Sequence, residues 1–201
     1  MANVNLSEKE RLLIMNTDFI LTKKAVIDKV CVLLGEVAEN YQKHLSQLAG
    51  HLPAEVVAVS PKISRGEQYQ GLPYVMLDYP RVFKGGDTFA VRTFFWWGNF
   101  FSITLHLSGQ YKSNLIANLA KHQGTLAQKG WYICVSTDPW RHHFEEDNYL
   151  RIDGVTNLED ILGRQSFVKI ANKIPLQEWD SVNMLLFEDF TFLFTALLEK
   201  H

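Results

Sequence analysis

The most apolar part of the chain runs from Thr88 to Leu107, where aromatic and β-branched residues surround one short break at Gly98-Asn99. Strands favour such residues, and glycine and asparagine accept the positive φ that a tight turn needs. The pattern therefore predicts a β-hairpin. Apolar and polar positions alternate on its second strand, so its two faces should differ. One face should carry Phe101, Ile103, Leu105 and Leu107, and the other Phe100, Ser102, Thr104 and His106.

The length of the hairpin loop decides on which face Arg92 lies. A two-residue loop would place Arg92 opposite Leu105 on the apolar face, whereas a three-residue loop over Trp97–Asn99 would place it opposite Thr104. Burying an unpaired guanidinium is costly, so we favour the three-residue loop. The hairpin should then have one dry face and one mixed face that carries Arg92 and His106.

Long helices are predicted near both ends of the chain. Apolar residues recur at steps of three and four over Thr22–Leu48, which is typical of an amphipathic helix. Ser7-Glu8-Lys9-Glu10 matches a capping box and predicts a short helix before it. The last helix should lie between Pro175 and Glu199. Its apolar arc is wide enough to need partners on two sides, and the second partner could be the long N-terminal helix or another subunit.

Weaker signals complete the expected fold. Short apolar runs predict strands at Glu55–Ser60, Pro73–Tyr79, Trp131–Ser136 and Tyr149–Asp153. We expect a loop at Lys62–Leu72, the end of a strand at Pro80, a helix between Gly109 and Gly130, and a short helix at Asn157–Leu162. Together these predict one α+β domain over residues 1–201. Its mostly antiparallel sheet of about five or six strands should carry the N- and C-terminal helices on one face.

Composition narrows the classes of partner. The 201 residues are 47% apolar and 21% charged, with a net charge of −2 and no basic block, which argues against nucleic acid as the main partner. No stretch is long and apolar enough to span a bilayer, and the N-terminus lacks the pattern of a secretory signal. We therefore expect no membrane association and a cytoplasmic location. Cys31 and Cys134 are isolated in apolar surroundings, which favours buried free thiols.

The segment from Asp138 to Asp147 holds the densest group of reactive side chains. His142 or His143 could act as a general base beside a carboxylate such as Glu146, so these three are the candidate catalytic residues. Adjacent histidines on an extended chain point to opposite sides, so we expect no metal site. The alternatives are a solvated loop anchored by Trp140, or anion contacts from Arg141 and His143. No nucleophile elbow, phosphate loop or dinucleotide fingerprint is present, and no cofactor is expected.

A ligand site on the mixed face of the hairpin is the leading functional hypothesis. Polar groups among aromatic rings are typical of small-molecule sites, and a guanidinium binds carboxylate or phosphate well. The candidate ligand-binding residues are Arg65, Tyr69, Arg92, Trp97 and His106. The alternative for Arg92 is an internal salt bridge with Glu67 or Asp78.

Three functions follow from these patterns. The first is a binding module for a small, anionic molecule in an aromatic pocket on the sheet. The second is an enzyme that uses the histidines and carboxylates of residues 138–147 for acid–base chemistry. The third is a homodimeric structural or interaction protein whose last helix, or the aromatic hairpin tip, forms the interface.

Overall fold

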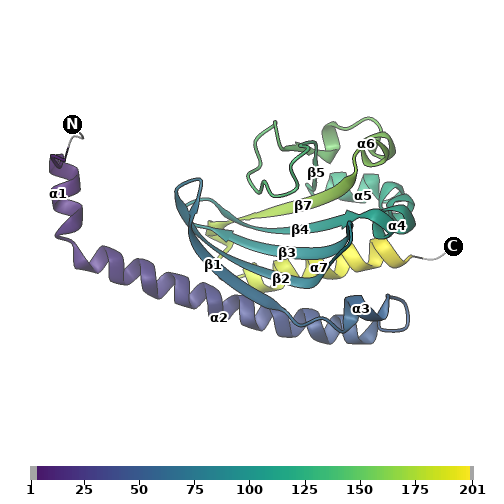
Figure 1. Ribbon diagram of the computed structural model, residues 1–201, viewed down its shortest axis with the longest axis horizontal. Coiled ribbons are helices and arrows are strands. Elements are labelled where there is room, and N and C mark those ends of the chain that lie inside the picture. Colours follow the sequence, from purple (N-terminus) through teal and green to yellow (C-terminus); the bar gives the residue numbers. More distant parts are fainter. Residues whose placement is uncertain (1–3, 200–201) are drawn as a thin grey trace.

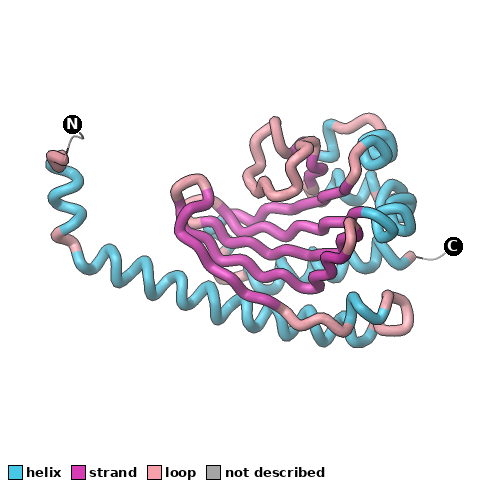
Figure 2. Tube along the Cα trace, viewed as in Figure 1, coloured by secondary structure: helices cyan, strands magenta, loops and turns pink. Residues whose placement is uncertain are grey.

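A computed structural model describes residues 4–199 as an α+β fold built on one antiparallel sheet (Figures 1 and 2). The seven strands are β1 (Lys62–Tyr69), β2 (Leu72–Lys84), β3 (Asp87–Trp96), β4 (Phe100–Ser108), β5 (Tyr132–Cys134), β6 (Tyr149–Arg151) and β7 (Phe167–Pro175). Their order across the sheet is β1-β2-β3-β4-β7-β5-β6. The predicted fold class is confirmed, with slightly more strands than expected.

The helices lie mainly on one face of the sheet and at one of its ends (Figure 1). They are α1 (Glu8–Ile14), α2 (Thr17–Gln47), α3 (Ala54–Val57), α4 (Gly109–Lys121), α5 (Gln123–Gln128), α6 (Leu158–Arg164) and α7 (Val182–Leu198). Short 3₁₀ turns occupy Ile152–Gly154 and Leu176–Glu178. Within residues 4–199, no helix combines the length and apolarity needed to cross a membrane.

The central hairpin has the three-residue loop that the sequence favours. Trp96 pairs with Phe100, and Arg92 lies opposite Thr104. Gly98 in the loop has φ +73, a conformation that costs glycine nothing. The register places Phe101, Ile103, Leu105 and Leu107 in the main core with no exposed surface.

Helices α2 and α7 cover the apolar face of the sheet and contact each other (Figure 1). The ring of Tyr41 in α2 stacks on Phe190 in α7, with 3.6 Å between centroids. The Tyr41 hydroxyl donates to the carbonyl oxygen of Leu186 at 3.1 Å, so this buried polar group is satisfied. The wide apolar arc of α7 is therefore covered by the sheet on one side and α2 on the other.

Several predicted elements were wrong. Lys62–Tyr69 is a strand because an edge strand needs only one partner and tolerates polar residues. Residues 54–57 form α3, since Pro53 precedes its first turn, as proline often does. Pro80 does not end β2, because a register shift between Asp78 and Arg81 accommodates its missing N–H.

Strand β7 was missed, although it lies near the middle of the sheet. Its apolar positions Val168, Ile170 and Ile174 alternate and face the helices. Lys169, Asn172 and Lys173 interrupt the apolar run and obscured that alternation. The predicted helix between Gly109 and Gly130 is two helices, α4 and α5, which meet at His122.

Candidate functional site

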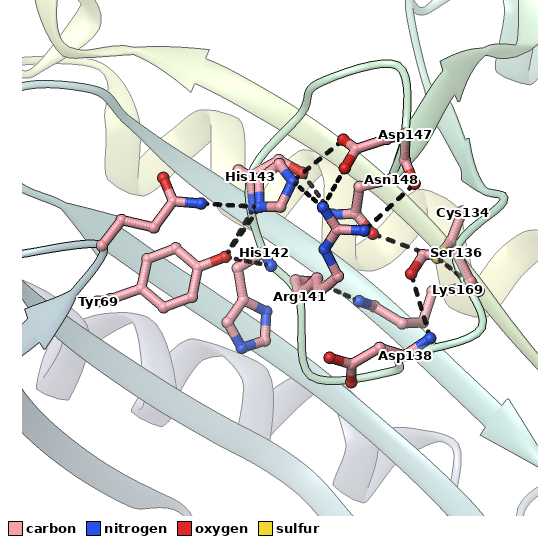
Figure 3. Close-up of polar contacts among 11 residues, drawn as sticks. Tyr69, Cys134, Ser136, Asp138, Arg141, His142, His143, Asp147, Asn148 and Lys169 are labelled. Carbon is pink, nitrogen blue, oxygen red and sulfur yellow. Dashed lines mark hydrogen bonds and ion pairs between the residues drawn. The ribbon is translucent and has the colours of Figure 1, made fainter.

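Residues 135–148, here called the cover segment, lie over the mixed face of the sheet (Figure 3). Tyr69, at the end of β1, holds this segment from the opposite edge. Its hydroxyl oxygen accepts the backbone N–H of His142 at 2.6 Å and of His143 at 3.1 Å. Nδ1 of His143 lies 3.3 Å from the same hydroxyl oxygen and 3.1 Å from Nε2 of Gln70.

A second set of contacts fixes the far side of the cover segment. Nε2 of His143 lies 3.3 Å from Oδ1 of Asp147, and Arg141 forms an ion pair with the same carboxylate. These contacts, led by the Arg141 hydrogen bond, lower the pKa of Asp147. The buried Asn148 side chain donates to the carbonyl of His143. The segment is therefore an ordered structure held by its own polar groups.

Arg92 is neutralised within the protein. Its Nε and Nη2 donate to the two carboxylate oxygens of Asp78 at 2.7 and 3.1 Å, a bidentate pair between β3 and β2. This is the internal salt bridge that the sequence offered as an alternative, with Asp78 as partner; Glu67 instead pairs with Lys23. Nη1 of Arg92 lies 3.1 Å from Nε2 of His142. Burial first, and then the Arg92 charge, lower the pKa of His142 well below its ordinary value.

Lys169 of β7 lies beneath the cover segment with 1% of its surface exposed. Its Nζ donates to the carbonyl oxygen of Arg141 at 2.6 Å, and burial lowers its pKa to about 8. His106 lies near it, and burial followed by the Lys169 and Arg92 charges lowers the pKa of His106 to about 4. The thiol of Cys134 is buried, and burial raises its pKa. The mixed face is thus a buried polar core.

The candidate catalytic residues do not form an open acid–base site in this arrangement. Both ring nitrogens of His143 contact protein groups, and Nε2 of His142 faces a guanidinium. Glu146 is exposed at the surface of the cover segment. Among residues 4–199, no group of three or more His, Cys, Asp or Glu side chains is placed to hold a metal ion.

The five predicted ligand-binding residues are divided between the two faces of the sheet. Tyr69, Arg92 and His106 lie under or beside the cover segment. Arg65 points to the helix face, where it pairs with Asp28 of α2 at 3.2 Å. Trp97 packs against the main core on that same face. The five therefore do not line one pocket.

An irregularity in β1 explains why Tyr69 and Arg65 lie on different faces. Arg65, Glu67 and Tyr69 would share one side of a regular strand, as their alternation predicts. The register shifts between Gly66 and Tyr69, and this shift turns Tyr69 to the opposite face.

An open cavity of about 470 Å³ lies at the sheet edge, away from the predicted residues. We call it the cationic notch; its principal lining residues are Phe100, Lys129, Gly130, Tyr132, Arg151 and Lys173. The notch exists because β5 pairs with β7 at only two positions, Tyr132–Ala171 and Ile133–Ile170. The chain turns at Gly130, with φ +75, and joins the sheet only at Tyr132, while β7 continues to Pro175.

The charge of the notch is strongly positive. Lys129 and Lys173 form no ion pair with any residue from 4 to 199. Arg151 is paired with Asp153, Nη2 to Oδ2 being 2.6 Å. The Lys173 ammonium and the Arg151 guanidinium lie 5.3 and 5.8 Å from the centre of the Tyr132 ring. The notch thus combines two unpaired cations with aromatic surface.

Sequence reasoning missed this site because its three cations come from separate parts of the chain, none of them in a motif. The three cations meet because β5 is short and begins only at Tyr132, which leaves the neighbouring part of β7 uncovered. Comparisons with protein-family models, with curated proteins and with solved structures gave no match for this chain.

Proposed function

We propose that the protein binds a small organic anion, a carboxylate or a phosphate ester, in the cationic notch. The observation that carries this proposal is the convergence of Lys129, Arg151 and Lys173 on one cavity of about 470 Å³. Lys129 and Lys173 form no salt bridge among residues 4–199, and the Lys129 charge also acts on the buried Asp189 carboxyl of α7. Cavities of about 300 to 1,000 Å³ are the usual size for small-molecule sites.

The chemistry of the lining favours an anion that carries a flat or apolar part. Lysine ammonium groups attract carboxylate and phosphate oxygens as point charges. Tyr132 and Phe100 offer ring surface beside those charges. The ligand class expected from the sequence is retained, and its place moves from Arg92 to the sheet edge. Arg92 is a weaker candidate because Asp78 already satisfies it.

Calorimetric titration with phenyl phosphate, citrate and neutral benzyl alcohol tests this proposal. We expect the two anions to bind and the alcohol not to bind, with affinity falling as salt is added. A Lys129→Ala, Lys173→Ala double variant should bind the anions at least about tenfold more weakly, since one charged hydrogen bond contributes about 1.5 kcal/mol.

The matched control is Lys43→Ala with Lys62→Ala. This variant changes the net charge equally but removes exposed lysines outside the notch. It should bind like the unmodified protein. Equal losses in both variants, or no binding of either anion at millimolar concentration, would contradict the proposal.

A further inference from the structure

Residues 4–21, here called the N-terminal arm, project beyond the end of the sheet (Figure 1). Every residue in the arm is exposed, yet Leu12–Met15 and Phe19–Leu21 are large and apolar. Their exposed fractions run from 42% for Phe19 to 78% for Met15. A contiguous apolar surface of this kind on a folded chain marks an interaction site.

The arm has a defined structure of its own. The Ser7 hydroxyl and the Glu10 carboxylate form a capping box that begins α1. The Asn16 side chain accepts the backbone N–H of Phe19 at 3.1 Å and caps α2. α2 then continues without a break into the body, where seven of its residues are buried. The arm is therefore presented in one position relative to the sheet.

A second apolar surface lies further along α2. A groove of about 730 Å³ runs between α2 and the start of α7, lined in part by Ala25, Val32, Leu33 and Trp179. Val32, in this lining, is 65% exposed. We call this the α2 groove.

We propose that the occupant of the α2 groove is the N-terminal arm of a second copy of this chain. Leu21, Ala25 and Val32 are spaced four and seven residues apart, so they share the side of α2 that faces away from the sheet. The arm ends at Leu21, and the groove begins one turn later on α2, at Ala25. If two α2 helices pair antiparallel about a two-fold axis near Ala25, each arm meets the other copy's groove.

The apolar area fits a stable dimer. Burying one such side chain contributes about 1.5 to 3 kcal/mol at about 25 cal/mol per Å², which corresponds to about 60 to 120 Å². The seven large arm residues with Val32, at their observed exposures of 42–78%, then offer roughly 300 to 600 Å² per copy. A standard interface buries about 800 Å² per partner, of which about 500 Å² is apolar.

The charges of the arm favour a protein partner over a lipid surface. The arm carries Lys9 and Arg11 against Glu8, Glu10 and Asp18. Helices that bind anionic membranes have a basic polar face, which this arm lacks.

Sedimentation velocity of the full chain at micromolar concentration tests the proposal. We expect a dimer, and we expect both an arm variant (Leu13→Glu, Ile20→Glu) and a groove variant (Val32→Glu) to sediment as monomers. Because all three positions are exposed, their circular dichroism and thermal midpoints should match those of unmodified protein at dilutions where it too is monomeric. Phe83→Glu, an exposed apolar position on β2, is the matched control and should remain dimeric.

Mixing the two monomeric variants gives a sharper result. In a mixed pair, the intact arm of the groove variant meets the intact groove of the arm variant, so one of the two contacts is restored. The mixture should therefore associate at least about tenfold more tightly than either variant alone. A monomeric unmodified chain, a dimer that survives both sets of substitutions, or a mixture no tighter than its components would overturn the proposal.

Discussion

The two faces of the sheet are both buried, but by different means. On the helix face, Leu77 and Ile103 pack against α2 and α7 with no exposed surface. On the other face, the Asp78–Arg92 pair and Lys169 lie beneath the cover segment, which has no helix. Leu77 and Asp78 are neighbours in β2 that point into these two different interiors.

The two interiors are stabilised by different kinds of interaction. Apolar packing is non-directional and roughly proportional to buried area, so it tolerates small rearrangements. A buried polar cluster depends on each partner being present, because an unpaired charge or N–H in a low dielectric is costly. We therefore expect the helix face to respond mainly to lost volume, and the covered face to respond to lost partners and to pH.

The largest effect should come from Asp78→Ala. This substitution leaves the Arg92 guanidinium without its carboxylate, and both side chains are less than 15% exposed (14% and 11%). Breaking a buried ion pair by removing one partner costs about 3 to 5 kcal/mol. Urea unfolding followed by circular dichroism measures this loss.

A second substitution, at Arg92, tests whether the loss of stability comes from the unpaired charge. Asp78→Ala with Arg92→Met should regain most of the loss, because no buried charge then remains unpaired. Leu77→Ala should cost about 2 to 5 kcal/mol, and Arg92→Met should not restore it. Equal responses of the two variants to Arg92→Met would show that the two faces do not differ as described.

Lowering the pH should decrease the stability contributed by one face of the sheet and increase that contributed by the other. The pKa of His106 on the covered face is lowered to about 4, so the unfolded chain takes up its proton first as pH falls. Stability should therefore fall by roughly 3 kcal/mol between pH 6.5 and 4 on account of His106. His106→Gln should flatten that part of the profile.

Asp189 in α7 provides the opposite case. Burial raises the pKa of Asp189 to about 6, so the folded chain takes up this proton first. Its contribution to stability is complete below about pH 4 and is lost as pH rises through 6. Asp189→Asn should therefore steepen the acid loss seen in unfolding curves from pH 4 to 7, and a shallower profile would contradict the assignment.

A smaller effect is expected from Tyr69→Phe. This change leaves the backbone N–H groups of His142 and His143 without their acceptor, at a cost of about 1 to 3 kcal/mol. Tyr74→Phe is the matched control, since its ring lies beside Tyr69 and its hydroxyl makes no hydrogen bond within residues 4–199. Similar losses in the two variants would remove Tyr69 as the anchor of the cover segment.

The parts of the fold that could be predicted are those where one local pattern carries the information. The register of the hairpin followed from the cost of burying Arg92, and α2 followed from its apolar repeat. β7 was not predicted because Lys169 is buried among polar partners that lie far away in the sequence. A strand that carries polar residues is hard to predict from the sequence when the hydrogen-bond partners of those residues come from distant parts of the chain.

The candidate sites were harder to predict for a related reason. Arg65 and Arg92 lie on opposite faces by the ordinary register of β1, β2 and β3, and only the bulge in β1 brings Tyr69 to the face of Arg92. The cationic notch depends on where β5 begins, and the boundaries of short strands are the part of a sequence pattern that is predicted least well. The apolar residues of the N-terminal arm were visible, but their exposure is a property of the tertiary structure.

The continuity of α2 has a mechanical consequence. A helix of 31 residues is about 46 Å long, and this one is anchored at its C-terminal half and unsupported at its start. The exposed first turns of α2 are therefore connected to its buried C-terminal half by continuous helix. A force applied to the first turns of α2 would be transmitted along this one helix to the stacked rings of Tyr41 and Phe190.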